Sequence, residues 1–405
     1  MKNSKPLKYL RIAALTAVMA GILPTGVIHA KGIESNKTCP DGNQKNTGDR
    51  SSGIMMVPAN SKDGDALPVY GNWKTFTTKN GLPSDHTYAV RIDGNRVWVG
   101  THDGLALYEN GKWRTYTTED GLPHNGVTAI DIDKQTGDLW IGTFGGLSRY
   151  SAGKFENFTQ LNSGLANDLI YSVICDGKDV WVATGGGVGH YDTYTKRWEI
   201  FTEQNAPMHE PWTYGVCAGG GKIFIAAWGG GVIEYKKDQK QFRDYVDPDH
   251  EMEIDLLPDD GPVHDITTGV SWSDGVLWVA TYFGLSRYDG LHWKGYFDDD
   301  SGLISNFINF VRADGPVAYL CTDKGLSYTD GNKWITYSRN SFGSSNGKMI
   351  FTNYGRDSDS TANKSKKEVP IAQSIAHNFV LGVDVKDGVI WLATEHGVSR
   401  GELIK

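Results

Sequence analysis

The sequence predicts an all-β fold, a seven-bladed β-propeller, from three observations. A motif of the form W-[VIL]-[GA]-T, followed by a tight turn and G-[LV], recurs along the chain. Its aromatic anchors are Trp98, Trp140, Trp181, Phe224, Trp278, Tyr319 and Trp391. Successive anchors are 42, 41, 43, 54, 41 and 72 residues apart, and such a period is typical of four short strands per repeat. The composition agrees, because 50 Gly and 13 Trp among 405 residues favour short strands joined by tight turns.

Aromatic pairs spaced i, i+3 mark the outer strand of each blade. They are Trp73/Phe76, Trp113/Tyr116, Phe155/Phe158, Trp198/Phe201, Phe242/Tyr245, Trp293/Tyr296 and Trp334/Tyr337. The first pair precedes the first anchor, whereas only a short strand to Lys405 follows the last anchor. We therefore expect the N-terminal strand, residues 71–78, to close the ring as the outer strand of the last blade, which would hide the sheet edges. The aromatic pairs themselves are expected to pack between blades.

The two long gaps between anchors predict insertions in the propeller, which covers residues 71–405. Residues 246–262 form an acidic stretch, and residues 339–370 form a Ser/Asn/Lys/Gly-rich segment that we interpret as a mobile loop. Residues 31–70 are polar and predict a disordered leader.

Residues 1–30 have the pattern of a secretory signal peptide: four basic residues, a short apolar run over 12–23, and a small-residue exit at Ala30. We therefore expect a periplasmic or extracellular protein. Cleavage would change the formal net charge from −8 to −12, because the segment holds four basic residues and no acidic ones. This acidic balance argues against a nucleic-acid partner. No later run of about 18 apolar residues exists, so we expect no membrane span in the mature chain, and we expect a monomer.

The four cysteines show neither CxxC nor a zinc-type spacing. Cys175 and Cys217 fall at similar places in successive repeats, so an exported protein offers two alternatives for them. They either form a disulfide or remain buried free thiols, and we favour the thiols.

The repeats GLPSDHTYAVRIDGNRVWVGTHDGLALYENGKWRTYTT and GLPHNGVTAIDIDKQTGDLWIGTFGGLSRY resemble the two-component regulator propeller repeat. The resemblance covers nearly all of residues 71–405. It implies a seven-bladed propeller of the kind that forms the periplasmic sensor part of hybrid two-component receptors and recognises ligands such as oligosaccharides. The sequence shows none of the membrane helix, kinase motifs or trailing sandwich domain of those receptors. We therefore expect a sensor-like recognition module without its own kinase.

Strand direction places candidate residues on one face of the ring. If each blade runs a, b, c, d from the axis outward, the d–a connections and the b–c turns emerge together on what we call the crossover face. Aligned on strand a, the d–a connections carry a series that Pro211 interrupts: Asp85, Asn125, Asp168, Asp265, Asn306 and Asn378. A ring of such groups suits a cation or a sugar. The alternative, which we favour, is a structural Asx turn into each inner strand.

The b–c turns vary between repeats and are better candidates for a ligand site. They carry His102, Asp103, Phe144, Gly185, Gly186, Trp228, Tyr282, Phe283, Asp323, Lys324, Glu395 and His396. Trp212 joins them from a d–a connection. Aromatic side chains not needed for packing offer flat faces to sugar rings or peptide side chains, although each one alone could equally cap a blade core. We predict as ligand-binding residues His102, Asp103, Phe144, Trp212, Trp228, Tyr282, Phe283, Glu395 and His396.

Histidines concentrate in the loops of this face: His86, His102, His124, His209, His264, His377 and His396. Blades 7 and 1 are neighbours in a closed ring, so their loops bring several imidazoles and carboxylates to one place. That combination suits a divalent transition metal or acid–base chemistry. The metal-ligand candidates are His86, His102, His377 and His396. No spacing matches a known metal motif, so no cofactor is expected and a divalent cation remains the alternative.

Other chemical motifs fail on their context. Gly397–Gly401 matches G-x-S-x-G but lies in a strand rather than a strand-to-helix elbow. The acidic alternation from Asp247 to Asp255 lacks the Gly and Glu of an EF-hand loop.

Two functions are compatible with the sequence. The first is a binding module for a glycan, peptide or protein ligand with no enzymatic activity, and the alternative is a metal-dependent propeller enzyme of the lyase or lactonase type.

Overall fold

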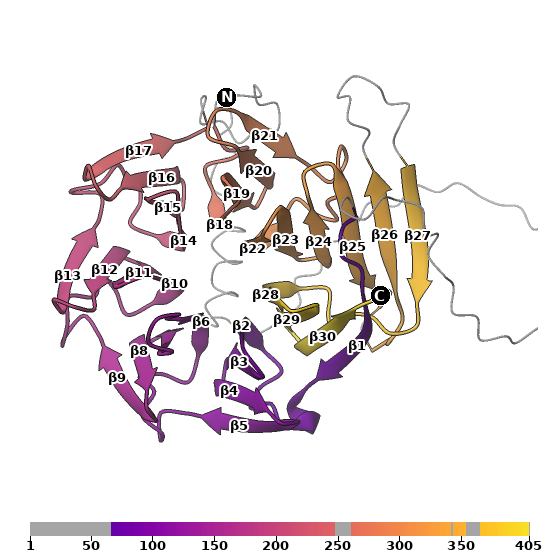
Figure 1. Ribbon diagram of the computed structural model, residues 1–405, viewed down its shortest axis with the longest axis horizontal. Coiled ribbons are helices and arrows are strands. Elements are labelled where there is room, and N and C mark those ends of the chain that lie inside the picture. The colour runs from indigo at the N-terminus through magenta and orange to yellow at the C-terminus, as the bar shows by residue number, and fades with distance from the viewer. Residues whose placement is uncertain (1–65, 248–260, 342, 354–364, 405) are drawn as a thin grey trace, which may run out of the picture. The chain divides into compact units, whose positions relative to one another are not determined.

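The computed structural model describes residues 66–247, 261–341, 343–353 and 365–404. Seven antiparallel sheets succeed one another around a common axis, which confirms the seven-bladed β-propeller (Figure 1). The predicted signal peptide (1–30), most of the predicted leader (31–70) and the acidic alternation beyond Asp247 lie outside the described residues. The one helical element in the described ranges is the short 3-10 helix η1 (Thr78–Asn80).

The blades follow one another in chain order. The innermost strands, a, are β2 (Thr87–Asp93), β6 (Val127–Ile132), β10 (Ile170–Asp176), β14 (Thr213–Gly219), β18 (Thr267–Ser273), β22 (Ile308–Asp314) and β28 (Val380–Lys386). The second strands, b, are β3 (Arg96–Thr101), β7 (Leu139–Thr143), β11 (Asp179–Thr184), β15 (Lys222–Ala227), β19 (Val276–Thr281), β23 (Val317–Thr322) and β29 (Val389–Thr394). The third strands, c, are β4 (Gly104–Glu109), β8 (Gly146–Ser151), β12 (Gly187–Asp192), β16 (Gly231–Lys236), β20 (Gly284–Tyr288), β24 (Leu326–Thr329) and β30 (Gly397–Leu403). The fourth strands, d, are β5 (Lys112–Tyr116), β9 (Lys154–Phe158), β13 (Arg197–Phe201), β17 (Gln241–Tyr245), β21 (Trp293–Tyr296), β25 (Lys333–Arg339) and β1 (Tyr70–Phe76).

The repeated anchors explain why the blades pack. All seven lie in the second strands, which are buried on both faces because each blade is covered by two neighbours. Trp140 stacks on Phe158 of its own outer strand with ring centroids 5.7 Å apart. Trp181 stacks in the same way on Phe201 at 5.8 Å. These two contacts lie within a blade. The aromatic pairs also pack between blades, as expected: Phe158 meets Tyr191 and Trp198 of the next blade, with ring centroids 5.2 and 5.9 Å apart.

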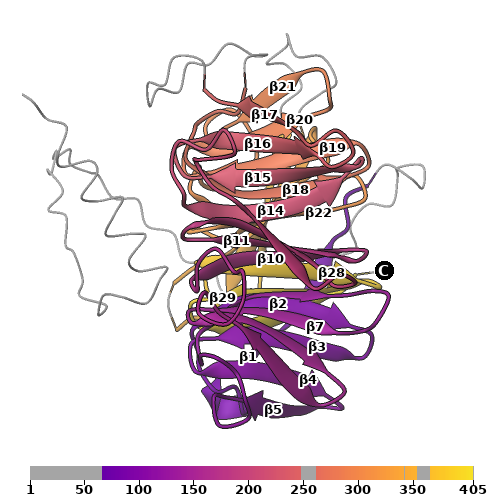
Figure 2. The ribbon, with the colours of Figure 1, turned by 90° about the vertical axis from the view of Figure 1, so that its left-hand side faces the viewer.

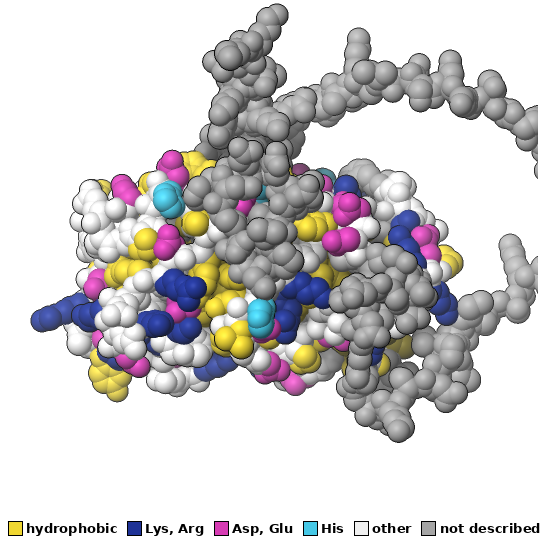
Figure 3. All heavy atoms as spheres, turned by 90° about the horizontal axis from the view of Figure 1, so that it is seen from above, with side chains coloured by type: hydrophobic (Ala, Val, Ile, Leu, Met, Phe, Trp, Pro, Cys, Tyr) yellow, Lys and Arg dark blue, Asp and Glu magenta, His cyan; other side chains and the backbone are white. Residues whose placement is uncertain are grey.

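Strand direction creates two different faces. In the edge-on view of Figure 2 the strands run across the thickness of the ring, so turns emerge at both ends. The d–a connections and the b–c turns share the crossover face, as expected, and the a–b and c–d hairpins form the opposite hairpin face. On the side of the ring seen in Figure 3, acidic and basic side chains are interspersed rather than gathered by sign.

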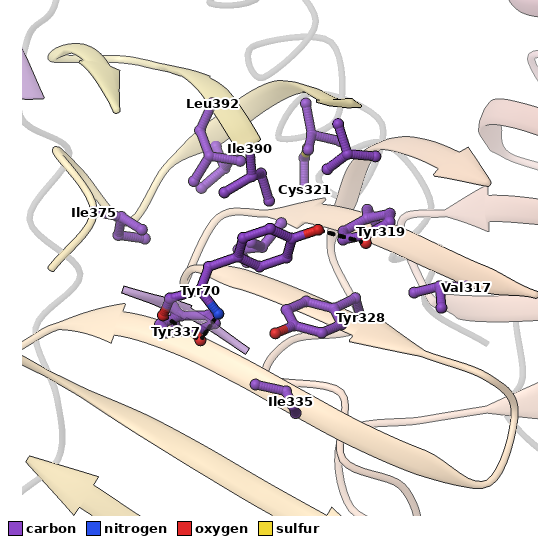
Figure 4. Packing of buried hydrophobic residues seen from close by; sticks show 14 of the residues in the cluster. Tyr70, Val317, Tyr319, Cys321, Tyr328, Ile335, Tyr337, Ile375, Ile390 and Leu392 are labelled. Carbon is purple, nitrogen blue, oxygen red and sulfur yellow. Dashed lines mark hydrogen bonds between the residues drawn. The ribbon is translucent and has the colours of Figure 1, made fainter. Parts of the chain in front are cut away.

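The N-terminal strand closes the ring. β1 pairs antiparallel with β30, with Phe76 opposite Val398, so blade 7 contains both ends of the propeller. Tyrosines of blade 6 also bind this strand. The Tyr337 hydroxyl donates to the Tyr70 carbonyl at 2.7 Å, and the Tyr70 and Tyr319 hydroxyls are 3.0 Å apart (Figure 4). Leu67 is also buried in this cluster. The packed chain therefore begins three residues before Tyr70, within the segment assigned to the leader.

The structure of blade 6 shows that the prediction of a mobile loop was wrong. Residues 339–370 were expected to form a mobile loop, but they contain β26 (Gly347–Asn353) and most of β27 (Ser365–Ile371), which extend this blade to six strands. Met349 is buried against the core, and Val369 packs on it, so apolar residues on one side of the hairpin hold it in place. The outer edge of β27 carries exposed lysines and Pro370, which are typical guards against edge-to-edge pairing.

Candidate ligand-binding face

Backbone hydrogen bonds hold the b–c turns against the d–a connections. The His102 N–H donates to the His86 carbonyl at 3.0 Å, and the Trp228 N–H donates to the Trp212 carbonyl at 2.9 Å. The same bond recurs in six blades, because the b–c turn of each lies beside the residue that precedes its inner strand. Both types of loop are therefore rigidly placed side by side on the crossover face.

The Asp/Asn series has a structural role, although not the predicted one. Asp85 Oδ1 accepts the N–H of Thr78 at 2.6 Å, seven residues earlier in the chain. The other members bond in the same way to Thr118, Gln160, Asp247, Asp298 and Arg339. Each side chain thus reaches back to the connection that follows the preceding outer strand. The predicted Asx turn forward into the inner strand is wrong, because each side chain bonds backward to a backbone N–H instead.

Large aromatic side chains form a continuous arc over blades 3 to 6. This aromatic arc consists of Tyr171, Tyr214, Trp228, Tyr282 and Phe307. Successive ring centroids are 4.6, 5.4, 5.9 and 3.9 Å apart. The last pair is stacked, with an interplanar angle of 7°. Two predicted site residues, Trp228 and Tyr282, are therefore neighbours.

The remaining predicted aromatics differ in their surroundings. Trp212 is 41% exposed, which is unusual for so large an apolar side chain. Phe283 instead stacks on the buried His264 at 4.1 Å and covers a turn. Phe144 contacts His124 and Tyr88, each with ring centroids 5.8 Å away. Trp212 is thus the most accessible of the three for a ligand.

Imidazoles and carboxylates of blades 7 and 1 meet as expected. This polar seam consists of His86, His102, Asp103, His377, Glu395 and His396. The His396 ring centroid is 4.8 Å from that of His377 and 6.2 Å from that of His86. His102 Nδ1 is 2.9 Å from Asp103 Oδ1. The structure brings the rings of His86, His377 and His396 together and places the His102 backbone against that of His86. A ligand contact at these residues stays a prediction.

Turn geometry limits which histidines can bind a metal. His377 Nδ1 accepts the Phe379 N–H at 3.1 Å, and His124 and His264 accept equivalent N–H groups two residues on. A neutral ring that accepts at Nδ1 carries its proton on Nε2 and has no free lone pair for a metal ion. Burial, together with the nearby His396, lowers the pKa of His377. In the part of the chain that the structure describes, no three His, Cys, Asp or Glu side chains are grouped to hold a metal ion.

The cysteines of the described chain are free thiols. Cys175, Cys217 and Cys321 form no disulfide, as favoured from the sequence. Cys217 and Cys321 are buried in separate apolar clusters.

Tyr88 is a candidate site residue that the sequence analysis missed. The second residue of every inner strand sits at a β-bulge, and Tyr occupies that position in blades 1, 3 and 4 as Tyr88, Tyr171 and Tyr214. A bulge re-aims its side chain, which here places the tyrosines beside the crossover face. Burial raises the pKa of Tyr88 to about 12, helped by the negative charges of Asp103 and Glu395. Aligning the inner strands would have shown Tyr at this position in three blades, but not the bulge that re-aims its side chain.

The sequence analysis also missed four charged side chains that pair between blades, three residues after the bulge in each inner strand. We call them the charged belt. Arg91 pairs with Asp131 at 3.0 Å and with Asp384 at 3.8 Å, and Arg312 Nε is 2.8 Å from Asp384. All four occupy the fifth position of an inner strand, in blades 6, 7, 1 and 2. Burial opposes the charge of Arg91, but the two aspartates outweigh it and raise its pKa. The charged belt ties together the four blades on either side of the ring closure.

Comparison with known proteins supports the architecture. No family model matches the chain, and no curated protein matches it by sequence. A solved structure of the extracellular domain of a protein described as a hybrid two-component system from B. thetaiotaomicron is similar, with a TM-score of 0.60 and 16% identity over 81% of this chain and 41% of that chain. A second such domain from B. thetaiotaomicron gives 0.59 and 16% over 81% and 39%.

Virginiamycin B lyase from Staphylococcus aureus gives a TM-score of 0.56 and 14% identity over 82% of this chain and 99% of that chain. The chain is a seven-bladed β-propeller. The match covers about two fifths of the length of those two extracellular domains and 99% of the lyase chain. At these identities the likeness shows the fold alone. No helix in the described ranges is long and apolar enough to cross a membrane.

Proposed function

We propose that this protein is an exported recognition module that binds an extracellular ligand on its crossover face. The observation that carries the proposal is the pairing of an aromatic arc with a polar seam on one face. Aromatic rings bind flat apolar surface, and a few polar groups fix orientation, which is the usual division of labour in ligand sites. A sensor role is supported by the similar extracellular domains of two-component systems.

The direct test is a screen of glycans and peptides against the purified protein. Trp212→Ala and Trp228→Ala are expected to abolish binding of whatever ligand the screen finds. Tyr194→Ala is the matched control, because Tyr194 is 85% exposed and lies in a c–d turn on the hairpin face. Binding that survives both tryptophan changes, or that Tyr194→Ala removes, contradicts the proposed face.

A metal-dependent enzyme is the second candidate, favoured by one contact. His102 Nδ1 lies 2.9 Å from Asp103 Oδ1, and a carboxylate that accepts from one ring nitrogen leaves the other able to bind a metal. The similar fold of a lyase also favours an enzyme. Metal analysis, with thermal unfolding in the presence and absence of EDTA, separates the candidates. Stoichiometric metal and a lower melting temperature with EDTA would favour the enzyme, whereas no metal and no EDTA effect would exclude a tightly held catalytic ion.

A further inference from the structure

We infer that the crossover face holds a carboxylate group of its ligand through Arg339, at the junction of blades 6 and 7. The inference rests on the proposed function, since it names one chemical group of the ligand that this face binds. It adds the residue that recognises this group and the sign of the group's charge.

Arg339 is anchored between the two blades through its backbone. It is the last residue of β25, from which the chain turns into β26 (Figure 1). Its N–H donates to Asn378 Oδ1 at 2.6 Å, and its carbonyl accepts a hydrogen bond from Asn378 Nδ2 at 2.9 Å. Asn378 belongs to the d–a connection of blade 7, so two hydrogen bonds hold Arg339 against that connection.

The guanidinium group is oriented by two backbone carbonyls. Nε donates to the Ser344 carbonyl, in the turn between β25 and β26, and Nη1 donates to the Ala376 carbonyl, in the d–a connection. Nη2 forms no hydrogen bond within the described part of the chain. Because the group is planar, the two bonds on the other nitrogens fix the direction in which the Nη2 N–H groups point. Arg339 is only partly buried, which leaves it within reach of solvent.

Arg339 differs from the other partly buried arginines because it has no carboxylate partner. Each of the others in the described ranges has an Asp or Glu oxygen within ion-pair distance: Arg91, Arg96, Arg149, Arg287, Arg312 and Arg400. Burial lowers the pKa of Arg339, and no carboxylate of the described chain raises it again. A guanidinium taken partly out of water without a counter-charge costs stability, and a bound anion removes that cost.

The fold does not require a basic residue at this position. Two residues after the second aromatic of each i, i+3 pair, the other six blades carry Thr78, Thr118, Gln160, Glu203, Asp247 and Asp298. Five of these six donate their N–H to the Asp/Asn series, as Arg339 does, so the repeated role of the position belongs to the backbone. The two carbonyl bonds give the Arg339 side chain a structural role in the turn after β25. That role accounts neither for Nη2 nor for the missing counter-charge.

The charges around Arg339 favour a carboxylate over a phosphate. Ala376 and Asn378 flank His377, and burial lowers the pKa of this imidazole, so it stays neutral at neutral pH. One guanidinium therefore supplies the positive charge, whereas Glu395, whose charge also acts on His377, adds a negative one. A carboxylate brings a single negative charge, but a phosphate monoester brings about 1.5 to 2. A planar carboxylate also matches a planar guanidinium.

The test uses three probes: benzoate, its neutral analogue benzamide, and inorganic phosphate, each titrated into the purified protein at neutral pH by calorimetry or NMR. We expect benzoate to bind about tenfold more tightly than benzamide, which corresponds to one hydrogen bond between charged groups, and phosphate to bind more weakly than benzoate. Equal affinities of benzoate and benzamide, tighter binding of phosphate, or no binding of benzoate would overturn the inference.

Variants assign the charge recognition to Arg339. Arg339→Gln removes the charge and is expected to weaken benzoate binding about tenfold while leaving benzamide binding unchanged. Arg400→Gln is the matched control, because Arg400 is also partly buried but already pairs with Glu402 at 2.5 Å, and it should change neither affinity. An unchanged benzoate affinity in Arg339→Gln, or an equal loss in Arg400→Gln, contradicts the assignment.

Arg339→Lys separates ligand binding from the structural role of the side chain. Lysine keeps the charge but lacks the fork that bridges the Ser344 and Ala376 carbonyls, so this variant should melt at a lower temperature and still prefer benzoate to benzamide. Benzoate should raise the melting temperature of the wild type and of Arg339→Lys, but not that of Arg339→Gln. A folded lysine variant without preference for benzoate would show that Arg339 only holds the two loops together, and the inference would be wrong.

The two proposals fail in different ways. If benzoate does not bind through Arg339 but the screen yields a ligand whose binding Trp212→Ala and Trp228→Ala abolish, the crossover face is the binding face and the carboxylate inference is wrong. If no ligand depends on those tryptophans, the proposed function itself is wrong.

Discussion

The two kinds of loop on the crossover face differ in how closely their residues repeat. The d–a connections carry Asp or Asn at one position in six blades, and each such side chain accepts a backbone N–H from near the start of its own connection. The b–c turns carry residues as different as Asp103, Trp228 and Glu395 at equivalent places. Their backbones are held by the same bond in six blades, so their side chains are free to differ.

This difference separates fold from function. A backbone group that must be satisfied in every blade selects the same residue type in every blade. A position whose side chain does not have to bond a backbone group can carry a ligand-binding residue instead. The comparison predicts large losses of stability where side chains serve the ring and small losses where they face a ligand.

The largest loss of stability is expected at Asp384, whose position carries different residues in different blades although its side chain stabilises the ring. Asp384 is 3% exposed, lies between Arg91 and Arg312, and also accepts the Ile92 N–H at 2.7 Å. Asp384→Ala leaves Arg91 with Asp131 alone and removes the acidic partner of Arg312 in the described part of the chain, so we expect the free energy of unfolding to fall by about 3 kcal/mol. Urea unfolding measures the change.

Asp384→Asn sharpens this result. The amide oxygen still accepts the Ile92 N–H but carries no charge, so its loss should lie between that of the wild type and that of the Ala variant. A loss below about 1 kcal/mol for the Ala variant would show that the charged belt does not stabilise the ring.

A second large effect depends on pH at a connection residue. Burial lowers the pKa of His264 to about 4, against an ordinary value of 6.5, despite the opposing charge of Asp265. Above pH 6.5 the folded and unfolded chains are both neutral at this residue. Between pH 6.5 and 4 only the unfolded chain gains a proton, so the free energy of unfolding should fall, by about 3 kcal/mol at pH 4.

His264→Asn isolates this contribution. Blade 3 has Asn167 at the same place, where its side chain accepts the Leu169 N–H at 2.9 Å, so the introduced asparagine can replace the acceptor for the Ile266 N–H without titrating. Unfolding curves at pH 7, 6, 5 and 4 should diverge between the two proteins. Parallel pH profiles would contradict the assignment.

A moderate effect is expected at the repeated acidic position. Asp85→Ala removes the acceptor for the Thr78 N–H, and we expect a loss of about 1 kcal/mol, as for other backbone N–H groups that lose a side-chain acceptor. Asp85→Asn should be nearly neutral in thermal unfolding, because Asn125 makes the same bond in blade 2. Equal losses in both variants would indicate that charge, rather than hydrogen bonding, selects the residue.

The smallest effect on stability is expected at Trp212. Its 41% exposure and its place on the crossover face suit a ligand contact rather than core packing. Trp212→Ala should change the free energy of unfolding by no more than about 0.5–1 kcal/mol while removing ligand binding. A much larger destabilisation would make Trp212 a structural residue and would weaken the comparison.

The fold was predictable because repetition amplifies a weak local pattern. One W-[VIL]-[GA]-T segment shows only a buried strand, but seven at a regular spacing show a ring, and the unpaired Trp73/Phe76 strand shows how it closes. The hairpin of β26 and β27 escaped prediction because its polar side dominates the composition, whereas the contact of Met349 and Val369 with blade 6 is a tertiary one.

The candidate site was predictable only in part. The loop positions followed from strand direction, so the meeting of His86, His377 and His396 was expected from the order of the blades. The role of Tyr88 was not, because a β-bulge depends on pairing with the neighbouring strand. The tautomer of His377 likewise depends on a hydrogen bond that composition cannot show.

The sequence by itself determined the number of blades, the order of the strands and the closing strand, because these follow from local pattern and counting. Only the tertiary structure decided which repeated side chains serve the backbone, which charges pair across blades, and which aromatics meet. Those outcomes depend on distances of a few ångströms between residues far apart in the chain, such as Arg91 and Asp384, and no local pattern encodes such distances.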